Sequence, residues 1–153
     1  MRATPPGLDL GAFRQSWNIV PDVAGAQLEH RVGEEAFLPS DGPGGTYSAV
    51  FEDDGDTGYF YGLDTTREQA GDNPILDALQ VYSVAAVEDR EASYPIEIRW
   101  AAEGNRAGLF IEGRCHAIFD FDLRRAVCRT GFPESSGEFT PSHDWDETLV
   151  AGL

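Results

Sequence analysis

One stretch, residues 107–121 (AGLFIEGRCHAIFDF), restricts the fold more than any other part of the chain. Its odd positions are small or apolar, whereas its even positions include the polar and charged residues Glu112, Arg114, His116 and Asp120. Because side chains of a strand alternate between two faces, this pattern predicts a β-ribbon with one apolar and one charged face. A continuous strand of this length would span roughly 50 Å, more than double the usual length. Gly113 is therefore expected to bend or bulge the ribbon while both halves stay in one sheet.

Three hairpins are predicted from turn residues between β-rich runs. Residues 46–51 and 57–63 flank Asp54-Gly55, a pair that suits a tight hairpin turn and places Val50 opposite Tyr59. The next hairpin joins residues 95–101 to 106–112, and the third folds residues 126–132 back on 115–121. These registers place Glu97 opposite Glu112 and Cys128 opposite Phe119.

Helical signals are short. Thr65 and Glu68 fit a capping box for one helical turn that Gly71 would end, and Ser142 is a candidate cap for a short helix near the C-terminus. Residues 75–87 mix the two periodicities and predict a helical turn followed by a strand. The predicted fold is thus mainly β, with α+β as the alternative: an antiparallel sheet of successive hairpins with one or two short helices. We expect a single domain over residues 1–153, of which 1–25 form an irregular arm.

Charge restricts the choice of partner. Eleven basic and 27 acidic residues give a formal charge of −16, which repels nucleic acid and anionic membranes and suits a basic protein. No run of 18 apolar residues is present and the N-terminus lacks the apolar block of a signal peptide, so the cytoplasm is the expected location. In the predicted register the two cysteines share a face about 13 Å apart, too far for a disulfide, so both are expected to be reduced and buried.

An acidic hairpin tip beside aromatic residues is the first candidate binding site. Acid and tyrosine together are typical of a patch that captures a basic protein surface, because Tyr supplies contact area at low entropic cost. The competing interpretation is a solvated hairpin tip with no role in recognition. The candidate residues are Glu52, Asp53, Asp54, Asp56, Tyr59 and Tyr61.

A polar face on the central ribbon is the alternative site. Two opposed carboxylates beside a histidine suggest a small hydrolase or a ligand-binding enzyme, although no apolar pocket is evident that would separate the two carboxyl pKa values. A surface lattice of salt bridges explains the same residues without a site. This face comprises Glu97, Arg99, Glu112, Arg114, His116, Asp120 and Arg129.

Sequence motifs for cofactors and catalysis are absent. His30, His116 and His143 are scattered without metal-ligand spacing, and the chain has no phosphate-binding loop, GxSxG or zinc-finger pattern. Cys115 and His116 are neighbours on a strand, so they point to opposite faces and cannot form a thiol–imidazole pair. We therefore predict no metal, no cofactor and no catalytic residue.

The segments FEDDGDTGYFYGLD (51–64), ILDALQVYSV (75–84) and GRCHAIFDF with CRTGFP (113–133) resemble a family of small bacterial proteins catalogued as a domain of unknown function. This resemblance implies a bacterial source and a compact domain, but no activity that transfers. Two hypotheses follow. The first is a non-enzymatic protein that captures a basic partner, specifically an immunity protein neutralising a toxin encoded nearby. The second is the enzyme described above, and a structural role without specific recognition remains a third alternative.

Overall fold

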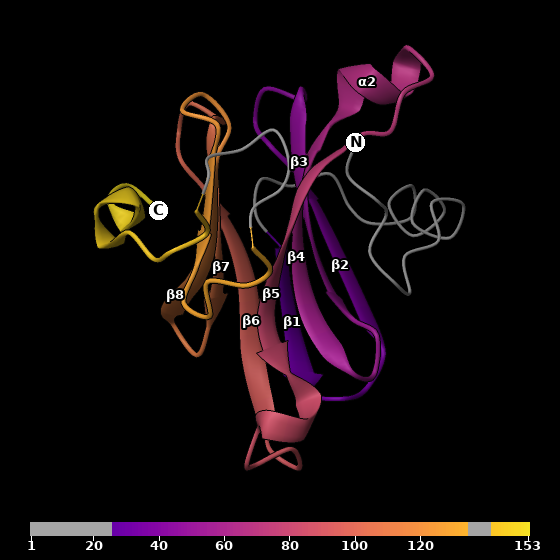
Figure 1. The fold of residues 1–153 in the computed structure, drawn as a ribbon, viewed down its shortest axis with the longest axis vertical. Helices are drawn as coiled ribbons and strands as arrows, with labels where there is room; N and C mark the ends of the chain where they lie inside the picture. The colour runs from indigo at the N-terminus through magenta and orange to yellow at the C-terminus, as the bar shows by residue number, and fades with distance from the viewer. Residues whose placement is uncertain (1–25, 135–141) are drawn as a thin grey trace.

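Two antiparallel sheets pack against each other in the computed structural model, which describes residues 26–134 and 142–153 (Figure 1). The first sheet has the order β1 (Ala26–Arg31), β6 (Ser93–Trp100), β7 (Arg106–Ile111), β8 (Arg114–Asp120) and β9 (Arg125–Cys128). The second sheet has the order β2 (Ala36–Asp41), β3 (Tyr47–Asp53), β4 (Thr57–Asp64) and β5 (Ile75–Ser83). The prediction of a mainly β, antiparallel fold built from hairpins is confirmed. The irregular arm predicted for residues 1–25 lies outside the described residues.

The core lies between the two sheets and uses every second residue of the central strands. Phe60 of β4 contacts Phe119 of β8 across the interface, with their ring centroids 5.3 Å apart. Gly62 permits this approach, because a Cβ there would stand 2.8 Å from the Phe119 ring. At the edges, Trp100 Nε1 donates to Ser40 Oγ at 2.9 Å, and the backbone of Gln80 pairs with Phe132. Both contacts join one sheet to the other.

Successive strands alternate in direction, so the connections divide between two ends of the sandwich (Figure 1). The β1–β2, β3–β4, β5–β6 and β7–β8 connections share the end drawn at the bottom of Figure 1. Their proximity is confirmed by a hydrogen bond from Val84 N to Asp56 O at 2.9 Å, which joins two of them. The other four connections lie at the opposite end.

All three predicted hairpins form, but each register differs from the prediction by two residues. Val50 lies opposite Tyr61 instead of Tyr59, because the tight turn is centred on Gly55-Asp56, with Gly55 at φ 97°. Glu97 lies opposite Phe110 and not Glu112. Cys128 lies opposite Ala117 and not Phe119. A shift of two preserves the face of every side chain and changes only its cross-strand partner.

The stretch 107–121 is a hairpin rather than one bent ribbon. Glu112 and Gly113 adopt φ values of 51° and 77°, the left-handed pair that a two-residue turn requires, and β8 returns along β7. An irregularity in register beside Phe110 then moves Cys115 to the outer face, whereas His116 lines a cavity between the sheets. The sequence predicted Cys115 on the apolar inner face and His116 on the charged outer face, so the prediction is wrong at these two residues.

Helical structure is limited, in the described residues, to α2 (Thr65–Gln69) and two single turns of 3-10 helix, η1 (Val84–Ala86) and η2 (Glu147–Val150). The helical turn predicted from Thr65 is confirmed, with Asp64 as its cap. The turn predicted at the start of 75–87 is wrong, because Ile75 already belongs to β5. The cap of η2 is Asp146 and not Ser142. Within these same parts of the chain, no helix is long and apolar enough to cross a membrane.

The outer face of the first sheet is covered by the C-terminal segment. Phe110, Ile118 and Val127 are buried there beneath Leu149 and Trp145. Phe110 and Ile118 occupy even positions of the stretch 107–121, where most side chains are polar or charged, and this cover explains their burial. Both cysteines are free and buried, as expected, but they lie on opposite faces: Cys115 in this outer cluster and Cys128 in the core.

Candidate functional site

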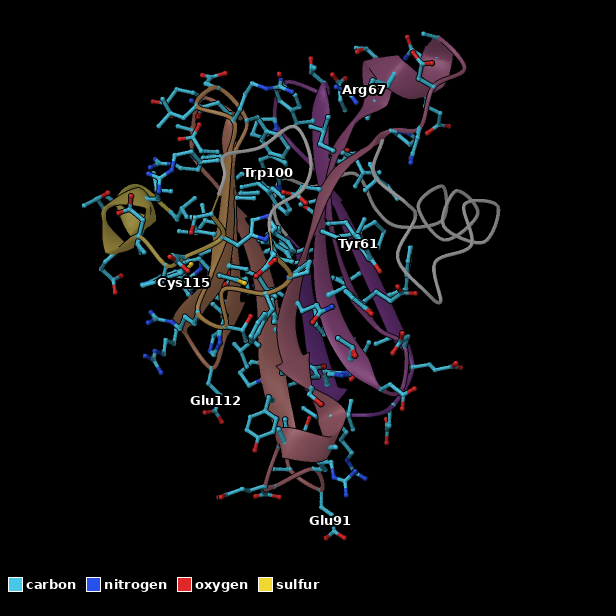
Figure 2. All side chains as sticks on the ribbon, viewed as in Figure 1. Tyr61, Arg67, Glu91, Trp100, Glu112 and Cys115 are labelled. Carbon is cyan, nitrogen blue, oxygen red and sulfur yellow. The ribbon has the colours of Figure 1, made fainter. Side chains whose placement is uncertain are left out.

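Negative charge is concentrated at one end of the sandwich. The β1–β2, β3–β4, β5–β6 and β7–β8 connections carry eight acids and one arginine, a formal charge of −7, whereas the four connections at the opposite end carry four acids and two arginines, a charge of −2. Glu91 and Glu112 extend outward from this end in Figure 2. We call it the acidic end, and its carboxylates are Glu34, Glu35, Asp54, Asp56, Glu88, Asp89, Glu91 and Glu112.

A small apolar cavity of about 160 Å³ is lined in part by connections of the acidic end. It is lined from both sheets, by β5 on one side and by β6, β7 and β8 on the other. The two connections β1–β2 and β5–β6 supply one valine each. The aliphatic lining residues are Val32, Val81, Val87, Ile96 and Ile111.

Tyr82, which forms one wall of the cavity, is fixed by a buried hydrogen-bond network. Its hydroxyl donates to Asp53 Oδ2 at 2.6 Å, and the same oxygen accepts from His30 Nε2 at 2.9 Å and from the backbone N–H of Gly33 at 2.8 Å. Burial alone would raise the pKa of Asp53, but hydrogen bonds from Tyr82, Gly33, His30 and Gly55 outweigh it and lower the pKa. Asp53 is therefore an ionised anchor that joins β1, β3 and β5.

Tyr94 joins the cavity to the acidic end. Its ring lines the cavity, and its hydroxyl donates to the backbone carbonyl of Asp89 at 3.0 Å. Burial, followed by the charges of Asp89 and Glu112, raises the pKa of Tyr94. Carboxylates from two separate connections thus act on the same wall residue.

His116 completes the lining and remains uncharged at neutral pH. Burial lowers its pKa to about 4, and the charges of Arg129 and Arg114 add to the effect. The ring therefore contributes a neutral surface beside the aliphatic residues. Its position inside the cavity results from the irregular register of β8, which the sequence does not signal.

The predicted acidic and aromatic patch is divided by the fold. Glu52, Asp54 and Asp56 retain exposure, but Asp53 is only 1% exposed and serves the Tyr82 network. The hydroxyl of Tyr61 is buried and donates to Glu52 at 2.8 Å. Tyr59 and Tyr61 are packed with Val50, Leu63, Ile75 and Ala78. The wide aromatic surface expected for β4 is therefore not available to a partner in this structure.

The predicted polar face of the central ribbon is also divided. Glu97 is bonded to Arg99 Nε at 2.6 Å on the outer face, whereas Glu112 occupies the β7–β8 turn. The other members separate further: Arg114 is exposed, His116 lines the cavity, Asp120 is buried at the far end of β8, and Arg129 lies over the ring of Trp145. The fold does not bring the Glu97, Glu112 and His116 side chains together as an acid, a base and a histidine.

A second buried pair lies away from the cavity. His143 Nε2 is 2.8 Å from Asp77 Oδ2, and Ala78 N donates to Asp77 Oδ1 at 2.8 Å. Sequence reasoning missed both buried networks, namely the contacts of Asp53 with His30 and Tyr82 and the contact of His143 with Asp77. Asp53 lies two residues after the core residue Phe51 on β3, and side chains two apart on a strand share a face. This spacing could have indicated that Asp53 points toward the core. Over residues 26–134 and 142–153, no group of three or more His, Cys, Asp or Glu side chains is arranged to hold a metal ion.

The fold and this site define a class: a two-sheet antiparallel β-protein with a small cavity at a strongly acidic end. The chain belongs to the DUF2251 family, described as uncharacterized proteins conserved in bacteria, whose model matches residues 30–153. The resemblance to a bacterial family of unknown function is thus confirmed.

A curated relative from Haemophilus influenzae (strain ATCC 51907 / DSM 11121 / KW20 / Rd) is 43% identical over 95 residues, which cover 58% of this chain. That relative is itself described as an uncharacterized protein, and the match covers 57% of its length. No solved structure matches the chain.

Proposed function

We propose that this protein is a non-enzymatic binding protein that captures a basic protein partner through its acidic end. The observation that supports the proposal is the charge of −7 on the four connections at that end, compared with −2 on the four at the other. Such a surface accelerates encounter with a basic partner and repels acidic ones. The alternative enzyme gains no support, because its three proposed residues are separated by the fold.

The specific form of the proposal is an immunity protein that neutralises a basic toxin encoded nearby. The family description does not bear on this role, so the support is physical. A compact, acidic protein can block the cationic surface that an enzyme uses to bind an anionic substrate. We propose the cytoplasm as the compartment, since the two buried cysteines are unpaired.

Calorimetry of the purified protein with the basic product of a neighbouring gene tests the proposal. We expect micromolar or tighter binding that weakens as salt is added. The triple variant Glu88→Gln, Asp89→Asn and Glu91→Gln should weaken binding at least tenfold. The matched control removes three charges at the opposite end, with Asp72→Asn, Glu103→Gln and Asp122→Asn, and should bind like the wild type. Absence of binding, or equal losses in both variants, would overturn the proposal.

A further inference from the structure

We propose that the cavity at the acidic end receives one aliphatic or aromatic side chain from a basic segment of the partner. This inference rests on the proposed function and adds the chemistry that is recognised: an apolar anchor flanked by Lys or Arg. Three properties of the cavity support it, namely its size, the charge around its mouth and its rigid walls.

The size of the cavity favours a single side chain over a metabolite. Sites for drug-sized ligands measure roughly 300–1,000 Å³, whereas an apolar cavity of roughly 150 Å³ binds a molecule as small as benzene. The cavity here is about 160 Å³ and is lined mainly by aliphatic groups. A Leu, Ile or Phe side chain matches this volume, and the lining offers few polar groups that would orient a larger ligand.

The charges around the mouth favour an anchor with basic neighbours. Each of three lining residues precedes carboxylates closely in the chain: Val87 precedes Glu88, Ile111 precedes Glu112, and Val32 lies two residues before Glu34. Asp89 approaches from the same loop, since its carbonyl is bonded to the Tyr94 hydroxyl. A side chain that enters the cavity would therefore bring its own neighbours close to the connections that carry these carboxylates.

The walls are held in place before any ligand arrives. Tyr82 is fixed at its hydroxyl by Asp53 and at its ring by Gly58, where an added Cβ would lie 2.5 Å from the ring carbons. Tyr94 is tied to the β5–β6 connection by its bond to Asp89. Because these side chains are already ordered, little conformational entropy remains to be lost on binding.

Short peptides provide a direct test with defined probes. The first is Gly-Arg-Arg-Leu-Arg-Arg-Gly, capped at both ends; the second replaces its leucine by glycine, and the third replaces its arginines by glutamine. NMR titration would follow the methyl groups of Val81, Val87 and Ile96. We expect the leucine peptide to shift these methyls and to bind about tenfold or more tightly than the glycine peptide, because burial of a leucine side chain contributes about that factor. The glutamine peptide should bind more weakly than the leucine peptide.

Variants that fill the cavity test the same point from the protein side. Val87→Phe should reduce binding of the leucine peptide to the level of the glycine peptide. If this variant fails to fold, Val32→Phe serves as the second test, because it places a ring in the same space from another connection. Leu123→Phe is the matched control, because Leu123 is 61% exposed on the β8–β9 turn at the opposite end. Circular dichroism would confirm that each variant is folded.

The outcomes separate this inference from the proposed function. Equal binding of the leucine and glycine peptides, or unchanged leucine-peptide binding by a folded Val87→Phe variant, would overturn the cavity as an anchor site. In that case, binding that still requires arginine would leave the capture of a basic partner intact. If the glutamine peptide bound as tightly as the leucine peptide, the requirement for basic neighbours would be wrong, and failure of all three peptides to bind would count against both proposals.

Discussion

At the scale of single residues, Asp53 is only 1% exposed, and its carboxylate accepts hydrogen bonds from several elements at once. Its two carboxylate oxygens accept from Tyr82, His30, Gly33 and Gly55. Replacing a buried acceptor that serves four donors is costly. Each donor left without a partner stays buried without the hydrogen bond that offsets its loss of hydration. The residue therefore stabilises the acidic end without being part of the exposed surface.

We predict that Asp53→Asn lowers the free energy of unfolding by about 2–4 kcal/mol, since the amide –NH2 group would face other donors and leave buried donors without an acceptor. Urea denaturation measures the change. Asp56→Asn, at an exposed position of the same turn, should remain within about 0.5 kcal/mol of the wild type. Similar values for the two variants would show that the network does not stabilise the fold.

His116 is expected to make the fold sensitive to mild acid. Its pKa is about 4 in the folded protein, below the ordinary value of 6.5, so the unfolded chain binds more protons between these values. Stability should therefore decrease as the pH falls from about 6.5 to about 4. An NMR titration should give a His116 midpoint near the lower value, and His116→Gln should reduce the loss of stability between pH 7 and pH 5. A midpoint near 6.5 would mean that the ring is solvated rather than buried.

At the scale of elements, the β7–β8 turn places a non-glycine residue in the left-handed region. Glu112 has φ 51°, a conformation that asparagine and glycine adopt at lower cost. The same residue supplies one of the carboxylates of the acidic end.

We predict that Glu112→Asn stabilises the protein by about 0.5–1 kcal/mol, because asparagine tolerates this conformation better. Gly113→Ala should destabilise it by about 1 kcal/mol, since Gly113 has φ 77° and no neighbouring atom within 4 Å of an added Cβ, which leaves backbone conformation as the sole cost. Thermal or urea unfolding of both variants would check the signs. Destabilisation by Glu112→Asn would indicate a structural contact of the carboxylate instead.

The β3–β4, β6–β7 and β8–β9 hairpins were predictable from the sequence, but the exact alignment of their strands was not. The alternation of Ala49 and Phe51 identifies the inner face of β3, yet a pattern of period two cannot distinguish registers that differ by two residues. The turn at Glu112-Gly113 was missed because glutamate is unusual at positive φ, although the excessive length of the ribbon was a usable signal. The cavity depends on side chains from four strands and two connections, together with the irregularity that turns His116 inward. Such a combination has no local signature.

At the scale of the whole molecule, the formal charge of −16 opposes compaction. Added salt shortens the range of this repulsion, from about 30 Å at 0.01 M to about 8 Å at 0.15 M ionic strength. Stability should consequently rise with salt, whereas the proposed binding of a basic partner should weaken. Measuring both the stability and the affinity as salt is added therefore separates repulsion within the protein from attraction to a basic partner.

We predict that the melting temperature rises between 0.01 M and 0.15 M sodium chloride, which differential scanning calorimetry would measure. The triple variant Glu88→Gln, Asp89→Asn and Glu91→Gln should show a smaller rise, because part of the repulsion has already been removed. A melting temperature that falls with salt would mean that attractive ion pairs, such as the one between Arg125 and Asp146, dominate the electrostatic energy.

The up-and-down order of the strands also affects how this protein could diversify. Every second connection reaches the same end, and each is a short loop between strands whose pairing is fixed elsewhere. Loops of this kind tolerate replacement, as the hypervariable loops of antibody domains do. If the acidic end captures a partner as proposed, transplanting these loops from one homologue onto another should transfer the choice of partner while the framework stays constant.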